Sequence, residues 1–198
     1  MNIGLTGGIA TGKSSVSAYL ASKGALLIDA DVIAREVMMP GHPVLAAAVQ
    51  RFGQAILNAD GTLDRKKLGS IVFQHPEERK ALEAITHPAI RKEMRERAAA
   101  YEMQYPDKLV VSDIPLLYES GLEDGFEEIM VVYVPREVQL ERLMSRDQMT
   151  LADAEARIAA QMDIERKKER ANIVIDNSGS WAQTEKQLQA FLTRKGLL

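Results

Sequence analysis

The chain has 198 residues, 46% hydrophobic and 27% charged, a balance typical of one globular domain with a sizeable core. Its net charge of −3 argues against a general nucleic-acid binder, and the lack of cysteine excludes disulfides and thiolate metal sites. No apolar run approaches the ~20 residues of a membrane span, and no signal peptide is evident. We therefore expect a cytoplasmic protein that binds neither membrane nor nucleic acid, as a monomer or a small homo-oligomer.

The first predicted elements are a buried strand at Ile3–Leu5 and a glycine-rich loop directly after it. Residues 7–14 read G-G-I-A-T-G-K-S and match the phosphate-binding pattern G-x-x-x-x-G-K-[ST]. Glycine at 7 and 12 suits a backbone that turns sharply, or one that a phosphate approaches closely. The N–H groups of such a loop form an anion nest at the start of a helix, which we expect to begin near Lys13.

The loop therefore predicts a site for a nucleoside triphosphate. Lys13 would contact the β- and γ-phosphates, and the Ser14 hydroxyl would bind Mg²⁺. A glycine-rich turn between a strand and a helix, without a ligand, is the alternative. The residues expected to contact ATP here are Gly7, Gly8, Ile9, Ala10, Thr11, Gly12, Lys13, Ser14 and Ser15.

Apolar runs suited to buried strands recur along the chain, and helical patterns separate them. They lie at Ile3–Leu5, Ala25–Ile28, Leu109–Val111, Ile129–Val134 and Ile173–Ile175. This alternation predicts an α/β protein of the P-loop kinase fold, with a five-stranded parallel sheet flanked by helices. Ligands of such a sheet gather at the carboxyl ends of its strands.

The stretch between Ile28 and Leu109 is too long for a single crossover helix. Helical patterns at 41–53, 63–73 and 76–105 are separated by turn residues. We interpret residues from about 36 to 105 as a helical insertion that holds the second substrate; a helical cap without a ligand is the alternative. The remaining core would comprise 1–35, 106–136 and 171–198.

A second gap, from about 137 to 170, is highly charged and contains few large apolar residues. It predicts one helix at 137–146 and one or two more at 151–170. Such a segment is either a solvated helical pair or a mobile lid over the phosphates. An amphipathic helix at 180–194 closes the chain.

Three aspartates follow predicted strands. Asp29 and Asp31 end the second strand in L-I-D-A-D, and alternation along an extended strand would place them on the same side. A kinase needs a carboxylate that orients the acceptor hydroxyl and takes its proton, and we favour Asp31 over Asp29. Asp31 could also cap a helix at 32–37. Asp113 ends the third long strand, the usual place for a carboxylate that holds Mg²⁺ or its water, although a turn residue is the alternative.

Two arginines in the charged segment, Arg142 and Arg146, are four residues apart and share a helix face. An arginine there could neutralise the transferring phosphate, although a single exposed arginine is more often a solvated charge. Arg157 and Gln161 form another such pair. No His/Asp/Glu group has a convincing structural-metal spacing, so the expected metal is nucleotide-bound Mg²⁺.

Several motifs together resemble the dephospho-CoA kinase family over most of the chain. They are T-G-G-I-A-T-G-K-S at 6–14, D-A-D-V-I-A-R at 29–35, H-P-A-I at 87–90, P-L-L-Y-E at 115–119, R-I-A-A-Q at 157–161 and A-N-I-V-I-D-N at 171–177. The phosphate loop alone is common to many proteins, whereas the other motifs in this order are far more specific. The resemblance implies transfer of the ATP γ-phosphoryl group to the ribose 3′-hydroxyl of dephospho-CoA.

The resemblance also implies roles for individual residues. Asp31 would be the base, supported in catalysis by Lys13, Arg142 and Arg146, and Asn177 would join the ATP site. The implied substrate-binding residues are Asp29, Asp31, Arg35, His87, Pro115, Leu116, Leu117, Glu119, Arg157 and Gln161. Without the resemblance, Glu119 could equally pair with an arginine, and a lone histidine such as His87 is usually structural.

The chain departs from the family pattern at two places. Ala10-Thr11 replaces a common Gly-Ser in the loop, where a negative φ at residue 10 would be tolerated and a positive one strained. Asn172 stands where aspartate is common.

Three other functions are alternatives. Another small-molecule kinase would share the fold and the loop. A GTPase-type switch would need N-K-x-D to read guanine, which this chain lacks, and its D-N-S-G at 176–179 follows the last strand, the wrong place for a switch. A purely structural protein would leave the glycine loop unexplained.

Overall fold

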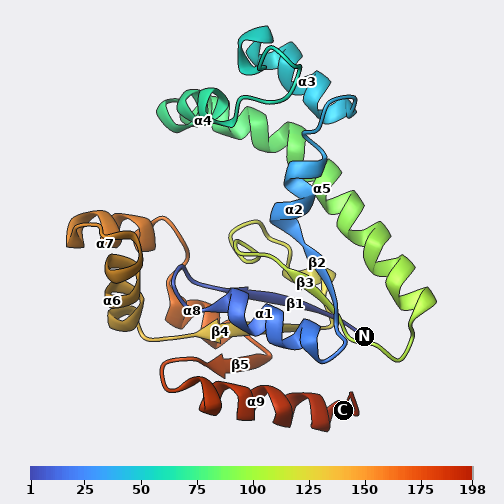
Figure 1. The fold of residues 1–198 in the computed structure, drawn as a ribbon, viewed down its shortest axis with the longest axis vertical. Helices are drawn as coiled ribbons and strands as arrows, with labels where there is room; N and C mark the ends of the chain where they lie inside the picture. Colours follow the sequence, from blue (N-terminus) through green and yellow to red (C-terminus); the bar gives the residue numbers. More distant parts are fainter. Residues whose placement is uncertain (198) are drawn as a thin grey trace. The chain divides into compact units, whose positions relative to one another are not determined.

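The computed structural model describes residues 1–197 (Figure 1). They form two compact units, one of residues 1–28 with those from 98 onward, the other of Asp29–Arg97. We call the first the sheet unit and the second the helical unit. Our predicted insertion, from about 36 to 105, covers most of the helical unit.

The sheet has five parallel strands in the order β2-β3-β1-β4-β5, which confirms the predicted fold class. The strands are β1 Asn2–Gly7, β2 Leu26–Asp29, β3 Val110–Asp113, β4 Glu128–Tyr133 and β5 Ile173–Asp176. Each contains one of the predicted apolar runs or most of it. The register pairs Leu5 with Asp113 and Gly7 with Val132, so the carboxyl ends of β1, β3 and β4 lie at one edge of the sheet.

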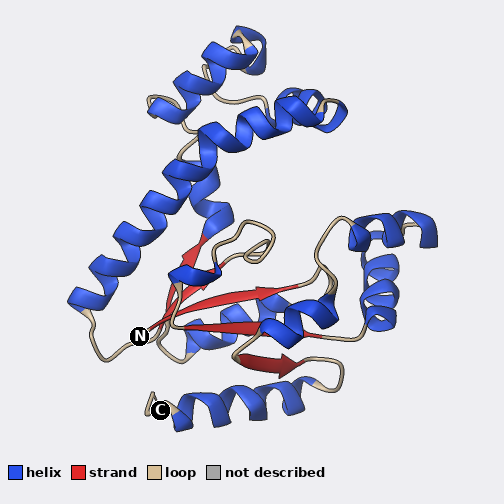
Figure 2. Ribbon diagram, turned by 180° about the vertical axis from the view of Figure 1, so that it is seen from behind, coloured by secondary structure: helices blue, strands red, loops and turns tan. Residues whose placement is uncertain are grey.

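The helices of the sheet unit cover the sheet and extend beyond its carboxyl edge (Figure 2). They are α1 Lys13–Ser22, α6 Arg136–Asp147, α7 Leu151–Ala159, α8 Ile164–Arg170 and α9 Trp181–Arg194, with a short 3-10 turn at Glu123–Gly125. Apolar residues of α1 and α9, among them Leu20 and Leu188, join those of β1, β4 and β5 in one buried core. The rings of Tyr19 and Trp181 meet edge to face, 6.0 Å apart.

Two polar side chains form hydrogen bonds with the backbone at the two ends of β5. Asn172 donates its N–H to the Ile129 carbonyl and accepts the Ile129 N–H on its side chain, so a neutral amide suffices where aspartate is common. At the other end, Gln187 of α9 binds both the N–H and the carbonyl of Asp176, at 2.9 and 2.7 Å.

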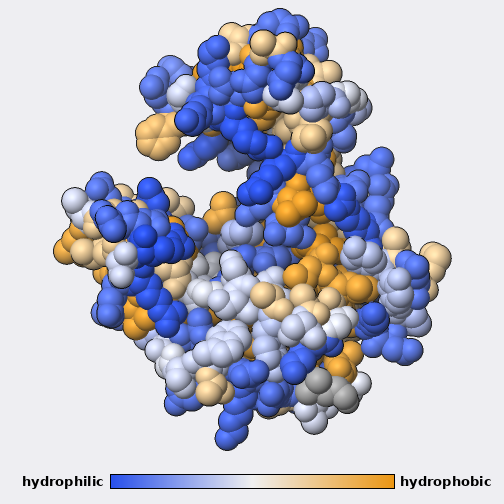
Figure 3. Space-filling view, viewed as in Figure 1, coloured by the Kyte–Doolittle hydropathy of each residue, from blue (hydrophilic) through white to orange (hydrophobic). Residues whose placement is uncertain are grey.

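The helical unit contains α2 Ala30–Glu36, α3 Pro43–Phe52, a 3-10 turn at Gln54–Ile56, α4 Arg65–Gln74 and the first part of α5 Pro76–Gln104. The helical patterns predicted at 41–53, 63–73 and 76–105 therefore match α3, α4 and α5. Leu45, Ala48, Ile56 and Leu68 are among its buried residues. Hydrophilic residues predominate on the surface of this unit that Figure 3 shows. Within residues 1–197 no helix is both long and apolar enough to cross a bilayer.

Candidate functional site

The glycine loop links the end of β1 to the start of α1. Gly12 caps α1 with φ +85°, and no side chain caps the helix, so the first N–H groups of α1 are left for a ligand. Ala10 has φ +62°, in the left-handed region that costs a side chain free energy. The expectation that a positive φ strains the loop therefore applies to this chain.

The loop glycines leave room for atoms of neighbouring segments. A Cβ on Gly8 would lie 2.3 Å from Nε2 of Gln139, and one on Gly12 would lie 2.3 Å from Nδ2 of Asn177. A Cβ on Gly7 would meet the Val132 carbonyl oxygen at 2.9 Å. Gly7 and Gly8 have no positive φ, so a sharp turn explains only Gly12.

Lys13 forms an ion pair with Asp113, which is buried at the end of β3. The register of β1 against β3 brings Asp113 beside the loop, as the sequence predicted. A charge-assisted hydrogen bond of this kind orients the ammonium group before a nucleotide arrives. The Ser14 hydroxyl and the Asp113 carboxylate are hard oxygen donors, the type that Mg²⁺ prefers. Within residues 1–197 there is no cluster of three or more metal-ligating side chains.

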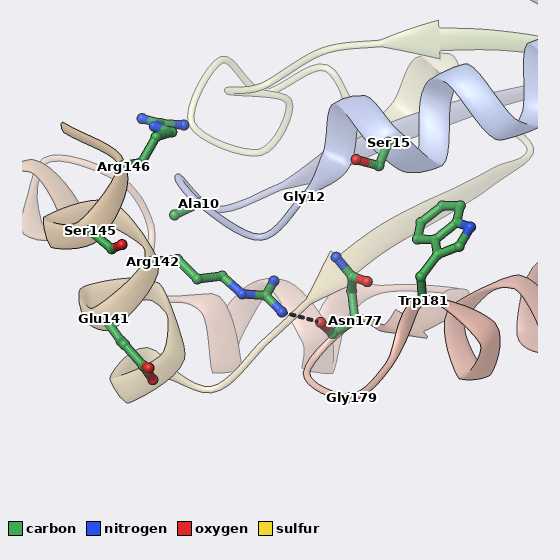
Figure 4. Close-up of a pocket in the computed structure, with 10 residues that line it drawn as sticks. All are labelled: Ala10, Gly12, Ser15, Glu141, Arg142, Ser145, Arg146, Asn177, Gly179 and Trp181. Atoms are coloured by element: carbon green, nitrogen blue, oxygen red, sulfur yellow. Dashed lines mark hydrogen bonds between the residues drawn. The ribbon is translucent and has the colours of Figure 1, made fainter.

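A cavity of about 560 Å³ adjoins the loop (Figure 4). It is lined by Ala10, Gly12, Ser15, Glu141, Arg142, Ser145, Arg146, Asn177, Gly179 and Trp181. Arg142 reaches across from α6 and donates to the Asn177 carbonyl at 2.8 Å. The Asn177 side chain donates to the Thr11 carbonyl and accepts from Thr184, so Asn177 holds the loop against α9. The cavity therefore has a basic wall, beside a phosphate-binding loop.

Arg146 and Arg157 both contact Asp147. Arg146 donates to it at 2.7 and 3.0 Å, and Arg157 donates at 3.2 Å. The hydrogen bonds from Arg146 lower the pKa of Asp147 and keep it ionised. Of the two predicted arginines of α6, Arg142 is thus bound to backbone and Arg146 to a carboxylate.

Lys167 is a functional candidate that sequence reasoning missed. It is fully buried, and its Nζ contacts the Gly7 and Pro115 carbonyls at 3.1 and 3.2 Å and Glu119 at 2.8 Å. Desolvation lowers the pKa of Lys167, and Glu119 opposes that shift. The charged stretch at 151–170 suggested solvent exposure. The spacing of Ile164 and Lys167, which places both on one face of α8, was the available signal.

Residues 115–119 differ in their surroundings. Leu116 is exposed, whereas Leu117 is fully buried and lies close to Gly4 of β1. Glu119 also accepts the Met162 N–H, so it joins this loop to the segment before α8. Gln161 accepts the Ile9 N–H at 2.8 Å, and Gln139, which sequence reasoning missed, donates to the Ile9 carbonyl at the same distance.

The helical unit carries the other predicted residues. Asp29 is the N-cap of α2 and accepts the N–H groups of Asp31 and Val32, so the alternative that Asp31 caps this helix is wrong. The strand does not stay extended through Asp31, because α2 begins at Ala30, and the expected alternation of the two aspartates fails. Asp31 and Arg35 are exposed, and His87 is half-buried inside α5.

The structure thus brings together the loop, Asp113, Arg142, Arg146, Asn177 and Gln161 in the sheet unit. Asp29, Asp31, Arg35 and His87 belong to the helical unit.

A phosphate loop at the carboxyl edge of a five-stranded parallel sheet is the arrangement of the P-loop kinase fold. A shikimate kinase from Acinetobacter baumannii has the same fold, with a TM-score of 0.54 and 19% identity over 98% of this chain and 94% of that one. Two solved structures are more similar. TT1252 from Thermus thermophilus has a TM-score of 0.80 at 36% identity, over 98% of this chain and 97% of that one. The dephospho-CoA kinase from Campylobacter jejuni has a TM-score of 0.77 at 33% identity, over 100% and 98%.

The sequence comparisons name the family. The model described as dephospho-CoA kinase matches residues 1–183. A dephospho-CoA kinase from Halalkalibacterium halodurans is 48% identical over 98% of this chain and 96% of its own length. The chain belongs to the dephospho-CoA kinase family, which confirms the resemblance drawn from its motifs.

Proposed function

We propose that this protein transfers the γ-phosphoryl group of ATP to the ribose 3′-hydroxyl of dephospho-CoA, giving coenzyme A and ADP in the last step of coenzyme A biosynthesis. The observation that carries the proposal is the family match over nearly the whole chain, together with an intact phosphate loop whose lysine is already oriented by Asp113. We also propose a cytoplasmic location, for which the lack of cysteine is supporting evidence.

ATP binding rests on the sheet unit. The phosphates would lie against the uncapped N-terminus of α1, where backbone N–H groups and Lys13 supply positive charge. The nucleoside would occupy the cavity beside the loop, with Arg142 and Trp181 in its wall. Mg²⁺ held by Ser14, with Asp113 nearby, would neutralise charge on the β- and γ-phosphates.

Acceptor activation rests on Asp31. Its carboxylate would take the proton of the 3′-hydroxyl as that oxygen forms a bond to the γ-phosphorus and the bond to the β–γ bridging oxygen breaks, releasing ADP. Asp31 is the better candidate of the two aspartates because Asp29 is engaged in capping α2. Arg35, His87, Pro115, Leu116, Leu117, Glu119, Arg157 and Gln161 remain proposed contacts of the acceptor.

A coupled ADP-release assay tests the proposal. Purified protein with ATP and Mg²⁺ should release ADP rapidly with dephospho-CoA, and only slowly with pantetheine or AMP. Mass spectrometry of the product should show one added phosphoryl group. Equal rates with all acceptors, or none with dephospho-CoA, would overturn the assignment.

A further inference from the structure

The phosphate loop is bound at Ile9 by two glutamines from the segment that we predicted as a lid. Gln139 of α6 donates from Nε2 to the Ile9 carbonyl, and Gln161, just after α7, accepts the Ile9 N–H; both distances are 2.8 Å. Gln139 is only 2% exposed. Gln139 lies near the start of α6 and Gln161 just after the end of α7, and both contact the same loop residue, Ile9.

The Ile9 carbonyl belongs to the same peptide group as the Ala10 N–H. A trans peptide is planar, and its C=O and N–H point in opposite directions. The hydrogen bond from Gln139 therefore fixes the direction of the Ala10 N–H, which points away from Gln139. Rotating this peptide by about half a turn would bring φ of Ala10 from +62° to a negative, unstrained value. Gln139 thus opposes the flip that would relieve Ala10.

Three further observations concern this arrangement. A Cβ on residue 8 would lie 2.3 Å from the Gln139 amide nitrogen, so any residue other than glycine there would displace the Gln139 side chain. Oε1 of Gln139 is buried without a hydrogen-bond partner among the described residues. This unpaired atom costs free energy, which the contact that Nε2 makes must offset. Ala10 itself packs on the small apolar cluster of Leu143 and Ile158 between α6 and α7. Its methyl group therefore favours contact with this pair although its backbone is strained.

We propose that Gln139 and Gln161 are positioning residues that hold the phosphate loop in its nucleotide-binding conformation, so that the loop is fully formed only while the α6–α7 pair is docked on Ile9. The inference rests on the proposed ATP site. A neutral amide can donate a hydrogen bond, as Gln139 does, or accept one, as Gln161 does, without adding negative charge beside a polyphosphate.

The first test is a double-mutant cycle between positions 139 and 10, with the ATP Kd measured by titration calorimetry. Gln139→Leu should weaken ATP binding by roughly tenfold, because the freed peptide flips to relax Ala10. Adding Ala10→Gly should recover most of that loss, since glycine adopts a positive φ without strain. An equal loss with alanine or glycine at position 10 would overturn the inference.

The second test separates hydrogen bonding from charge at position 161. Gln161→Glu keeps an acceptor for the Ile9 N–H, so its thermal midpoint should match that of the wild type, while its negative charge should weaken ATP binding by roughly tenfold or more. Gln161→Leu should weaken ATP binding less than the glutamate variant does. A Gln161→Leu protein, which lacks the acceptor, that binds ATP as tightly as the wild type would contradict the proposal.

Steady-state kinetics provide a readout that general destabilisation would not reproduce. Gln139→Leu should raise KM for ATP about tenfold and leave KM for dephospho-CoA unchanged. Gln189→Leu, on the exposed surface of α9, is the matched control and should change neither. If wild-type protein fails to bind ATP, the proposed function fails. If it binds ATP and the variants bind equally well, only the glutamine inference fails.

Discussion

The two units stabilise their polar groups in different ways. In the sheet unit, Lys167, Gln139 and Asn177 are buried and each contacts the backbone of the phosphate loop. In the helical unit, Arg97 pairs with Glu36 and Glu93, and all three side chains are at least 35% exposed. Buried side chain–backbone contacts fix one geometry, whereas solvated ion pairs contribute little and rearrange easily. The comparison indicates a pre-organised phosphate site and a more adaptable helical unit.

The largest effect should come from Lys13. Lys13→Ala removes the charge that would contact the transferring phosphoryl group, and we expect kcat/KM to fall by about 10³-fold or more. The loss should at least equal that of Asp31→Asn. Lys23→Ala, at the other end of α1 and beside the Tyr19 ring, should leave kcat/KM unchanged. A Lys13 variant that retains most of its activity would remove the loop lysine from the mechanism.

Asp31 tests whether the helical unit contributes to chemistry. Asp31→Asn should lower kcat by about 10²–10⁴-fold while the ATP Kd stays the same. Asp29→Asn is the matched control, because asparagine caps a helix as well as aspartate and α2 should begin unchanged. Equal losses of kcat in the two variants would contradict the choice of Asp31 as the base.

Lys167 tests how much a buried polar contact stabilises the sheet unit. Lys167→Met leaves Glu119 without its buried partner, and the free energy of unfolding should fall by about 3–5 kcal/mol. Lys168→Met removes the neighbouring, more exposed lysine and should cost far less. Urea denaturation of both variants provides the measurement, and similar midpoints would show that Lys167 contributes no more than a surface charge.

Tyr133 provides a pH-dependent test in the sheet unit. Its hydroxyl donates to Glu165 at 2.5 Å, and this hydrogen bond raises the pKa of Tyr133 to about 12. Because the folded pKa exceeds the unfolded one, near 10, this stabilisation is complete below pH ~10 and is lost as pH rises through about 12. Tyr133→Phe should cost about 1 kcal/mol at neutral pH, and its deficit against wild type should shrink between about pH 10 and pH 12. A constant deficit in urea midpoints over that range would refute the shift.

The smallest effect should come from the surface of the helical unit. Glu36→Gln removes one partner of Arg97, and we expect the free energy of unfolding to fall by less than about 1 kcal/mol. Glu78→Gln, which loses the exposed pair with Arg51, should behave alike. A loss as large as that of Lys167→Met would show that the two units are stabilised in the same way.

Local sequence patterns were enough to predict the strands, most helices and the phosphate loop. Asp113 was predicted to end its strand, and it is the last residue of β3. The pattern at Asp29 and Asp31 was less reliable, since it offered Asp31 as the helix cap, whereas the backbone makes Asp29 the cap.

Gln139 and Lys167 were missed for another reason. Each contacts a loop residue more than a hundred positions away, and nothing near it in the sequence reveals that partner. The available indication for both residues was a polar side chain on the apolar face of a helix. Gln139 shares a face of α6 with Leu143, and Lys167 shares a face of α8 with Ile164. Such contacts become visible only once the fold is known.

The contacts of Gln187 with Asp176 have a consequence for solubility at high concentration. An outermost strand with free N–H and C=O groups offers a template on which a foreign strand can add. Here one glutamine side chain already occupies both groups of Asp176, at the carboxyl end of β5. At this residue the strand therefore offers no free backbone groups to another copy of the protein.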